Sequence, residues 1–156
     1  MSLRVIGGEL GGRRLASPRG RSTRPTRSAV REAWFSALGP GLAGARVLDL
    51  YAGTGALGIE ALSRGAASVR FVESDPAAFR LLRRNVEELG LTDRSELRRG
   101  DVFREIVGLE RGVYDVALAD PPYGSHAARL VGIWLEEPFA SCLMPKNTPL
   151  ASTSKV

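Results

Sequence analysis

A strand that ends at two consecutive prolines is the feature that most restricts how this chain can fold. The apolar run at residues 113–119 is followed directly by Asp120-Pro121-Pro122-Tyr123. Proline has no N–H to donate to a sheet, and it holds the residue before it in extended geometry. We therefore expect Asp120 to lie at the tip of a buried strand, with Tyr123 beside it.

Such a strand tip has the chemistry to bind a planar amine. The carboxylate of Asp120 and the carbonyl of Pro121 can each accept a hydrogen bond from one amino group. The ring of Tyr123 can stack on the heterocycle that carries the amine. The alternative is a proline-rich strand exit that Asp120 merely caps. The candidate catalytic residues are Asp120, Pro121, Pro122 and Tyr123.

A glycine-rich loop follows an earlier apolar run, residues 45–50. Glycines at 53, 55 and 58 allow a ligand to approach the backbone closely and open a helix expected over residues 57–64. Glu73 ends the next expected strand, residues 68–72, and lies 20 residues after Gly53. An acidic side chain at that spacing commonly binds ribose hydroxyls.

These glycines also fit the dinucleotide-binding pattern, so Asp49 decides between two cofactors. We expect its carboxylate at the mouth of the loop, where it would repel a pyrophosphate and favour a cationic amino-acid end. S-adenosylmethionine carries such an end, has an adenosine for Glu73 and contains no phosphate. The rival interpretation, a nicotinamide-linked oxidoreductase, explains neither Asp49 nor the proline tip.

Asp101 is a third acidic position that suits this cofactor. It follows an expected strand end near residue 99. It could accept a hydrogen bond from an adenine amino group, or it could cap a helix over residues 102–107. The predicted cofactor-binding residues are Asp49, Tyr51, Ala52, Gly53, Thr54, Gly55, Glu73, Ser74, Asp101 and Val102. They fall at the ends of successive strands, where open α/β sheets form their ligand crevice.

The remaining pattern predicts an α/β fold with a parallel sheet and right-handed crossovers. A helix is expected over residues 28–38, and another begins at Asp75-Pro76 and closes at Gly90. Residues 3–7 and 13–17 are predicted to form a β-hairpin. The expected buried positions of the two helices are Val30, Trp34, Ala37, Leu38, Phe79, Leu82, Val86 and Leu89.

Positive charge is concentrated near the N-terminus. Residues 1–31 contain eight arginines and one acid, Glu9, whereas the whole chain has a net charge of +5. Arginine suits bidentate phosphate contacts, so this region predicts nucleic-acid binding. The alternative is that arginine is simply frequent in this chain. The candidate contact residues are Arg4, Arg13, Arg14, Arg24 and Arg27.

Composition limits the other possibilities. The chain has 156 residues and 44% hydrophobic content, which fits one globular domain, and we expect a monomer. It lacks an apolar run of membrane-spanning length and an N-terminal signal region. A lone Cys142 fits the cytoplasm and excludes an internal disulfide, and a lone His126 gives no indication of a metal site.

Several motifs together resemble the class I S-adenosylmethionine-dependent methyltransferases. The opening of the chain and residues 30–35 narrow this to a resemblance to the bacterial 16S rRNA guanine-N2 methyltransferases of the RsmD type, over roughly residues 3–130. The motifs are residues 47–58, Phe71-Val72-Glu73-Ser74-Asp75, residues 120–124, Arg4-Val5-Ile6-Gly7-Gly8, Gly12-Arg13-Arg14 and Arg24-Pro25-Thr26.

The resemblance implies a Rossmann-like sheet, S-adenosylmethionine as the methyl donor, and the exocyclic N2 of a guanine as the acceptor. The implied partner is 16S rRNA or the small ribosomal subunit. Two alternatives stay open. One is a methyltransferase that acts on a DNA base amine, and the other is a non-catalytic RNA-binding fragment.

The composition changes near the C-terminus. The only two lysines, Lys146 and Lys155, lie within the last 11 residues. This break predicts a truncation, a frameshift or a foreign tail, with the last strands of the fold missing and the strand before Asp120 left as an exposed edge. We expect a basic hairpin and arm at 1–27, an incomplete methyltransferase core at 28–141 and a disordered tail at 142–156.

Overall fold

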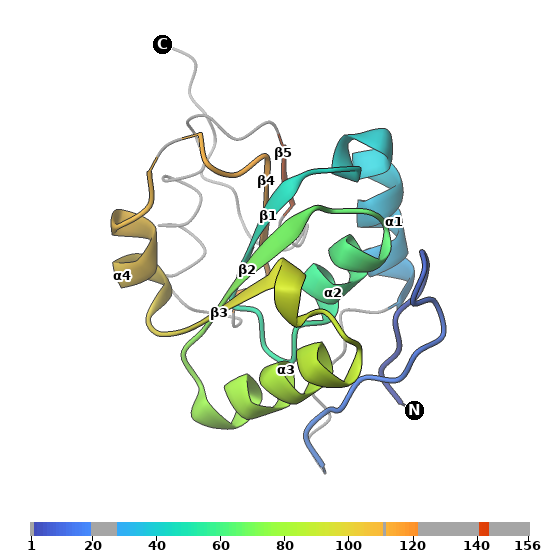
Figure 1. Ribbon diagram of the computed structural model, residues 1–156, viewed down its shortest axis with the longest axis horizontal. Coiled ribbons are helices and arrows are strands. Elements are labelled where there is room, and N and C mark those ends of the chain that lie inside the picture. Colours follow the sequence, from blue (N-terminus) through green and yellow to red (C-terminus); the bar gives the residue numbers. More distant parts are fainter. Residues whose placement is uncertain (1, 20–27, 111, 122–140, 144–156) are drawn as a thin grey trace.

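The computed structural model describes residues 2–19, 28–110, 112–121 and 141–143, and it contains a parallel sheet with helices on both faces (Figure 1). The strand order is β3-β2-β1-β4-β5, and every neighbouring pair is parallel. The predicted α/β fold is therefore confirmed. The strands are β1 Arg46–Leu50, β2 Ser68–Glu73, β3 Ser95–Arg99, β4 Val116–Ala119 and β5 Ser141–Leu143.

Two hydrophobic clusters fill the two faces of the sheet. Val47, Phe71 and Leu118 belong to the cluster beneath α1, α2 and α3, whereas Leu48 and Val72 pack with α4 on the other face. Figure 1 shows α4 opposite the other three helices. Side chains alternate along a strand, so consecutive apolar residues in β1 serve both faces. The helices are α1 Ser28–Leu38, α2 Ala56–Ser63, α3 Pro76–Glu88 and α4 Val102–Val107, with short 3₁₀ turns η1 Gly39–Leu42 and η2 Thr92–Arg94.

The helix-start signals in the sequence are confirmed. The side chain of Asp75 accepts a hydrogen bond from the Ala78 N–H at 2.7 Å, and Pro76 is the first residue of α3. Asp101 caps α4 in the same way, accepting from the Arg104 N–H at 3.2 Å. Both caps satisfy a backbone donor that the first helical turn leaves without a partner.

The buried face of α1 differs from the prediction. Arg31, Trp34 and Phe35 are buried, while Val30 is 38% exposed and Ala37 is also exposed. The predicted buried face of α1 was therefore wrong by about one residue along the helix. Arg31 is the reason for the difference. Arginine is usually exposed, so its position was not counted as part of the buried face of α1.

The N-terminal segment (residues 2–19) forms less sheet than predicted. Only an isolated antiparallel bridge joins Arg4 and Arg14, flanked by hydrogen bonds from Val5 N to Arg13 O and from Leu15 N to Leu3 O. The chain turns against α2 instead of extending the hairpin. A Cβ on Gly8 would lie 1.9 Å from the Ser63 carbonyl oxygen, so only glycine permits this approach.

The expectation of an exposed edge at β4 was wrong. β5 pairs with β4 in parallel, with Val116 opposite Ser141 and Leu118 opposite Leu143. β5 also crosses the expected domain boundary at residue 141. Pro122, Tyr123, Arg24 and Arg27 lie outside the described residues. Among the residues that are described, no helix is long and apolar enough to cross a membrane.

Candidate active site

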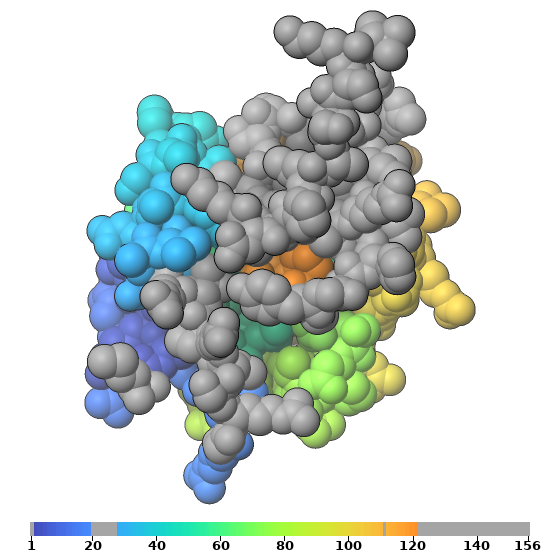
Figure 2. Space-filling view, turned by 180° about the vertical axis from the view of Figure 1, so that it is seen from behind, coloured from blue at the N-terminus to red at the C-terminus, as the bar shows by residue number. Residues whose placement is uncertain are grey.

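The carboxyl ends of four strands bring the predicted site residues to one edge of the sheet. Leu50 pairs with both Val72 and Ala119, and Glu73 pairs with Arg99. Figure 2 shows the end of β4 in orange close to the green of α2 and α3. The glycine loop, Glu73, Asp101 and Asp120 therefore all leave the sheet at the edge where α/β folds bind ligands.

Glu73 fixes the glycine loop from the neighbouring strand. Its Oε2 accepts from the Gly53 N–H at 2.6 Å, and its Oε1 accepts from the Asp75 N–H at 2.8 Å. The Ala52 N–H donates to the Val72 carbonyl at 3.0 Å. Each carboxylate oxygen has further lone-pair capacity after these bonds, so Glu73 can hold the loop and still accept from a ligand hydroxyl.

The backbone of the loop is bent in a way that exposes Gly53. Tyr51 has a φ of 57° and is the one non-glycine residue with a positive φ in the part of the chain that the structure describes. Gly53 and Gly55 also have positive φ, at 58° and 88°. A Cβ on Gly55 would lie 2.5 Å from Leu82, but one on Gly53 would meet nothing within 4 Å. Gly53 therefore presents bare backbone to open space, as a ligand cradle requires.

Asp49 lies beneath the loop, not at its mouth as the sequence suggested. It is 1% exposed, and its Oδ2 accepts from the Gly58 N–H at 2.9 Å. Gly55, the N-cap of α2, has no side chain to cap the helix, so Asp49 supplies this acceptor from the strand below. A Cβ on Gly58 would lie 2.2 Å from the Phe71 ring, so glycine at this position allows α2 to pack close to Asp49.

Burial makes Asp49 an unusual carboxyl group. Its pKa is raised to about 8, mainly by desolvation; the Gly58 hydrogen bond acts to lower the pKa, and the charges of Asp120 and Glu73 add to the rise. Its Oδ1 is buried and has no hydrogen-bond partner in the structure. Three carboxyl groups, those of Asp49, Glu73 and Asp120, thus lie at this edge. A cationic ligand would favour the ionised form of Asp49 and a phosphate would oppose it, so the edge suits a cation better than a phosphate.

Tyr51 and Asp101 lie on the side of the site nearest α4. Burial, followed by the charge of Asp101, raises the pKa of Tyr51 to about 12. The buried Tyr51 hydroxyl has no hydrogen-bond partner. Asp101 and Ser74 are exposed, whereas Val102 is 3% exposed and packs in the core beside α4. The side chain of Val102 is therefore unavailable to a ligand, and only its backbone could contribute.

Asp120 enters the site from β4. It is half-buried, and Pro121 after it is buried. Since Ala119 pairs with Leu50, Asp120 follows the sheet beside Tyr51. Its charge is among the causes that raise the pKa of Asp49.

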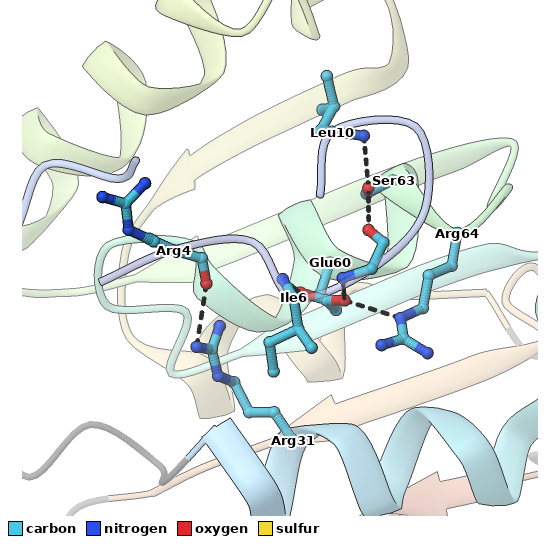
Figure 3. Close-up of polar contacts among 8 residues, drawn as sticks. Arg4, Ile6, Leu10, Arg31, Glu60, Ser63 and Arg64 are labelled. Atoms are coloured by element: carbon cyan, nitrogen blue, oxygen red, sulfur yellow. Dashed lines mark hydrogen bonds and ion pairs between the residues drawn. The ribbon is translucent and has the colours of Figure 1, made fainter. Parts of the chain in front are cut away.

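Two of the predicted nucleic-acid-binding arginines are brought together. The antiparallel bridge sets Arg4 opposite Arg14, and both are exposed, as is Arg13. Directly opposite residues in such a pair lie close together, and like charges there repel. Arg31 differs from the rest of the basic region, because it is 3% exposed and donates to the Arg4 carbonyl at 3.1 Å (Figure 3).

Sequence reasoning missed three buried polar side chains that hold the N-terminal segment. They are Glu60, Ser63 and Asn85. The available signal was their spacing: Asn85 follows Leu82 by three residues and therefore lies on the apolar face of α3. A polar residue on such a face must be satisfied by hydrogen bonds in the interior.

A separate hollow of about 270 Å³ opens at the opposite, amino edge of the sheet. Its arginines already have partners, since Arg70 pairs with Glu96 at 2.7 Å and Arg46 with Asp115 at 3.6 Å. The three-carboxylate edge is the better candidate for a functional site.

Comparison with known proteins identifies the family. The family model "Conserved hypothetical protein 95" matches residues 3–139. The chain belongs to this family. It is 43% identical over 124 residues to "Putative rRNA methyltransferase YlbH" of Bacillus subtilis, a match that covers 78% of this chain and 67% of that protein. Family membership identifies the chain as an RsmD/YlbH-type member of the class I S-adenosylmethionine-dependent methyltransferases.

Two further comparisons agree. Ribosomal RNA small subunit methyltransferase D of Buchnera aphidicola is 34% identical over 119 residues, covering 76% of this chain and 62% of that protein. The solved structure of "Putative methyltransferase yhhF" from Escherichia coli is 33% identical, with a TM-score of 0.76, over 89% of this chain and 75% of that one. The chain thus spans about two thirds of the length of these two curated relatives.

Proposed function

We propose that this chain transfers a methyl group from S-adenosylmethionine to the exocyclic N2 of a guanine in 16S rRNA. The observation that carries the proposal is the convergence of Asp49, Glu73 and Asp120 around an open glycine loop. The name of the Buchnera relative, a small-subunit rRNA methyltransferase, supports the substrate class.

The residues at this edge fit S-adenosylmethionine. Glu73 can accept from the ribose hydroxyls with its remaining lone pairs, and Gly53 leaves room for the ligand against its backbone. Asp120 would supply negative charge for a ligand that carries an ammonium and a sulfonium group, and the positive charge of that ligand would favour ionisation of Asp49. Asp101 and Ser74 are exposed at the expected adenosine side.

The acceptor amine would be held by the strand tip. Its lone pair is delocalised into the guanine ring, so it is a poor nucleophile. Hydrogen bonds to the Asp120 carboxylate and the Pro121 carbonyl would hold the amine out of the ring plane and aim its lone pair. When bound, S-adenosylmethionine would supply the methyl group and leave as S-adenosylhomocysteine, and the proton that the methylated amine loses would pass to the Asp120 carboxylate or to water.

Asp120 need not be a strong base in this scheme, because the amine becomes acidic only after it gains the methyl group. Tyr123, outside the described residues, is proposed to stack on the guanine. The guanine must be unpaired or flipped out to reach the strand tip. The exposed arginines of the N-terminal segment, Arg4, Arg13 and Arg14, are proposed to contact RNA phosphates, as are Arg24 and Arg27.

Transfer of a labelled methyl group tests the proposal. The substrates are small ribosomal subunits from cells that lack the modification, naked 16S rRNA and duplex DNA. We expect label on the RNA or the particle, located at guanine N2 by nucleoside analysis. Label on DNA alone, or label on RNA at a different atom, would contradict the proposed substrate.

A further inference from the structure

Asn85 joins the N-terminal segment to the glycine loop through one buried amide. It lies on α3 and is 1% exposed. Its Oδ1 accepts from the Ala16 N–H at 2.7 Å, and its Nδ2 donates to the Ala16 carbonyl at 3.1 Å. The same Nδ2 donates to the Thr54 carbonyl at 2.9 Å. Thr54 lies between Gly53 and Gly55, so this amide touches the candidate cofactor site from behind.

The three bonds explain why this position holds asparagine. The Ala16 N–H needs an acceptor, while the carbonyls of Ala16 and Thr54 need donors. A single orientation of the amide supplies both. Aspartate would turn a carboxylate oxygen toward both carbonyls, and leucine, which would suit the apolar face of α3, would leave three buried polar groups without partners.

The N-terminal segment is also attached to α2, the helix that begins at the glycine loop. Glu60 accepts from the N–H groups of Ile6 and Gly7 at 2.8 and 2.9 Å, and the Ser63 hydroxyl accepts from the Leu10 N–H at 2.9 Å. Figure 3 shows these side chains pointing from α2 toward the segment. None of these bonds reaches the loop itself. Asn85 is thus the direct polar link between segment and loop among the contacts that the structure describes.

We propose that Asn85 is a positioning residue that couples the N-terminal segment to the glycine loop. Ordering of either element then stabilises the other. The identity of the two ligands rests on the proposed function: RNA held by Arg4 and Arg14 on the segment, and S-adenosylmethionine on the loop. By linkage, RNA binding would tighten the cofactor site by the same factor by which the cofactor tightens RNA binding.

Amide hydrogen exchange tests the coupling, with S-adenosylhomocysteine as the probe ligand. The reporters are the Ala16 N–H on the segment and the Gly55 N–H on the loop, which donates to Ala52. The variants are Asn85→Asp and Asn85→Ala. Ser63→Ala is the matched control, because it removes the hydroxyl's bonds to the Leu10 N–H and the Gly7 carbonyl of the segment and touches no loop residue.

In the ligand-free protein we expect both Asn85 variants to exchange faster than wild type at Ala16 and Gly55, by at least about tenfold. Ser63→Ala should accelerate exchange near Leu10 and leave Gly55 unchanged. The probe should slow exchange at Ala16 in wild type but not in Asn85→Ala. If Asn85→Asp does not fold, Asn85→Ala still tests the coupling. The smaller side chain leaves space for a water that can hydrogen-bond to the Ala16 N–H and to the carbonyls of Ala16 and Thr54.

Unchanged exchange at Gly55 in Asn85→Ala would overturn the coupling. So would equal protection of Ala16 by the probe in wild type and in that variant. The failure of the proposed function has a different signature. In that case the probe protects nothing in wild type, while the ligand-free comparison still shows Ala16 and Gly55 loosening together.

Discussion

Asp49 is the residue whose chemistry departs furthest from its ordinary behaviour. Burial raises its folded-state pKa to about 8, well above the ordinary value of 3.8. Between these values the folded protein keeps a proton that the unfolded chain has released. The free energy of unfolding should therefore fall as pH rises from about 4 to about 8 and level off above that range.

Asp49→Asn should remove this dependence, because asparagine keeps an oxygen acceptor for the Gly58 N–H and carries no charge. Chemical denaturation near pH 5 and near pH 9 measures how the free energy of unfolding changes with pH. We expect wild type to lose a few kilocalories per mole more than the variant between the two conditions. The same variant should bind S-adenosylmethionine more weakly at pH 9. Parallel pH profiles for both proteins would show that burial does not raise the pKa of Asp49.

Asp120 is expected to act on the amine and not on the cofactor. Asp120→Ala should lower kcat by at least about 100-fold, the usual effect of losing a group that stabilises a transition state. Affinity for S-adenosylmethionine should change by only a few-fold. Asp93→Ala, an exposed acid in η2, is the control. A collapse of cofactor affinity in Asp120→Ala, measured by calorimetry, would assign Asp120 to the cofactor site instead.

Gly53 of the loop and Gly58 of α2 give opposite predictions that follow from what a Cβ would meet at each position. Gly53→Ala adds a methyl into open space at a positive φ, so the fold should lose about 1–2 kcal/mol while cofactor affinity falls at least tenfold. Gly58→Ala forces a contact of 2.2 Å with Phe71, so the fold itself should lose about 3 kcal/mol or more. Thermal unfolding and calorimetry separate the two. Unchanged cofactor affinity in Gly53→Ala would contradict the proposed cradle at Gly53.

At the scale of elements, the N-terminal segment packs on α2 and carries exposed arginines. Arg4 and Arg14 face each other across one bridge, so an RNA phosphate there would relieve their repulsion. Arg14→Gln should reduce the slope of log affinity against log salt by about one unit. Arg84→Gln, an exposed arginine on α3 that pairs with Glu88, is the control. Equal slopes for Arg14→Gln and wild type would remove Arg14 from the RNA contact.

The sequence predicted the elements well where local chemistry decides them. The Asp75-Pro76 start of α3, the Asp101 cap of α4 and the end of α1 before Gly39-Pro40 all follow from caps and breakers that act within one turn. It failed where tertiary contacts decide. Arg31 at a core position misled the reading of α1, and the N-terminal residues dock on α2 through Glu60 instead of completing a hairpin.

The candidate site, like the elements, could be predicted from the sequence only in part. That the acidic residues converge at the carboxyl ends of the strands was predictable, because parallel strands share one edge. The depth of Asp49 was not predictable, since it depends on how closely Gly58 lets α2 approach the sheet. The role of Asn85 was also hidden, because its partners Ala16 and Thr54 are 69 and 31 residues away in sequence.

At the scale of the whole molecule, the strand order places the glycine loop after a central strand. β1 lies between β2 and β4, so the loop after it has Glu73 on one side and Asp120 on the other. The N-terminal segment reaches the same loop through Asn85 of α3, and α2 begins at that loop. The proposed cofactor site, the proposed amine site and the basic surface are thus attached to one loop, so the proposed reaction could use all three together.

A crystal structure of the chain with S-adenosylhomocysteine tests the central claim most directly, because it shows where the ligand lies. We predict ribose hydroxyls that donate to Glu73, ligand atoms against the bare backbone of Gly53, and the ammonium end on the side of Asp49 and Asp120. A ligand bound elsewhere, or one whose ribose does not reach Glu73, would contradict the assignment of this edge as the methyl-donor site.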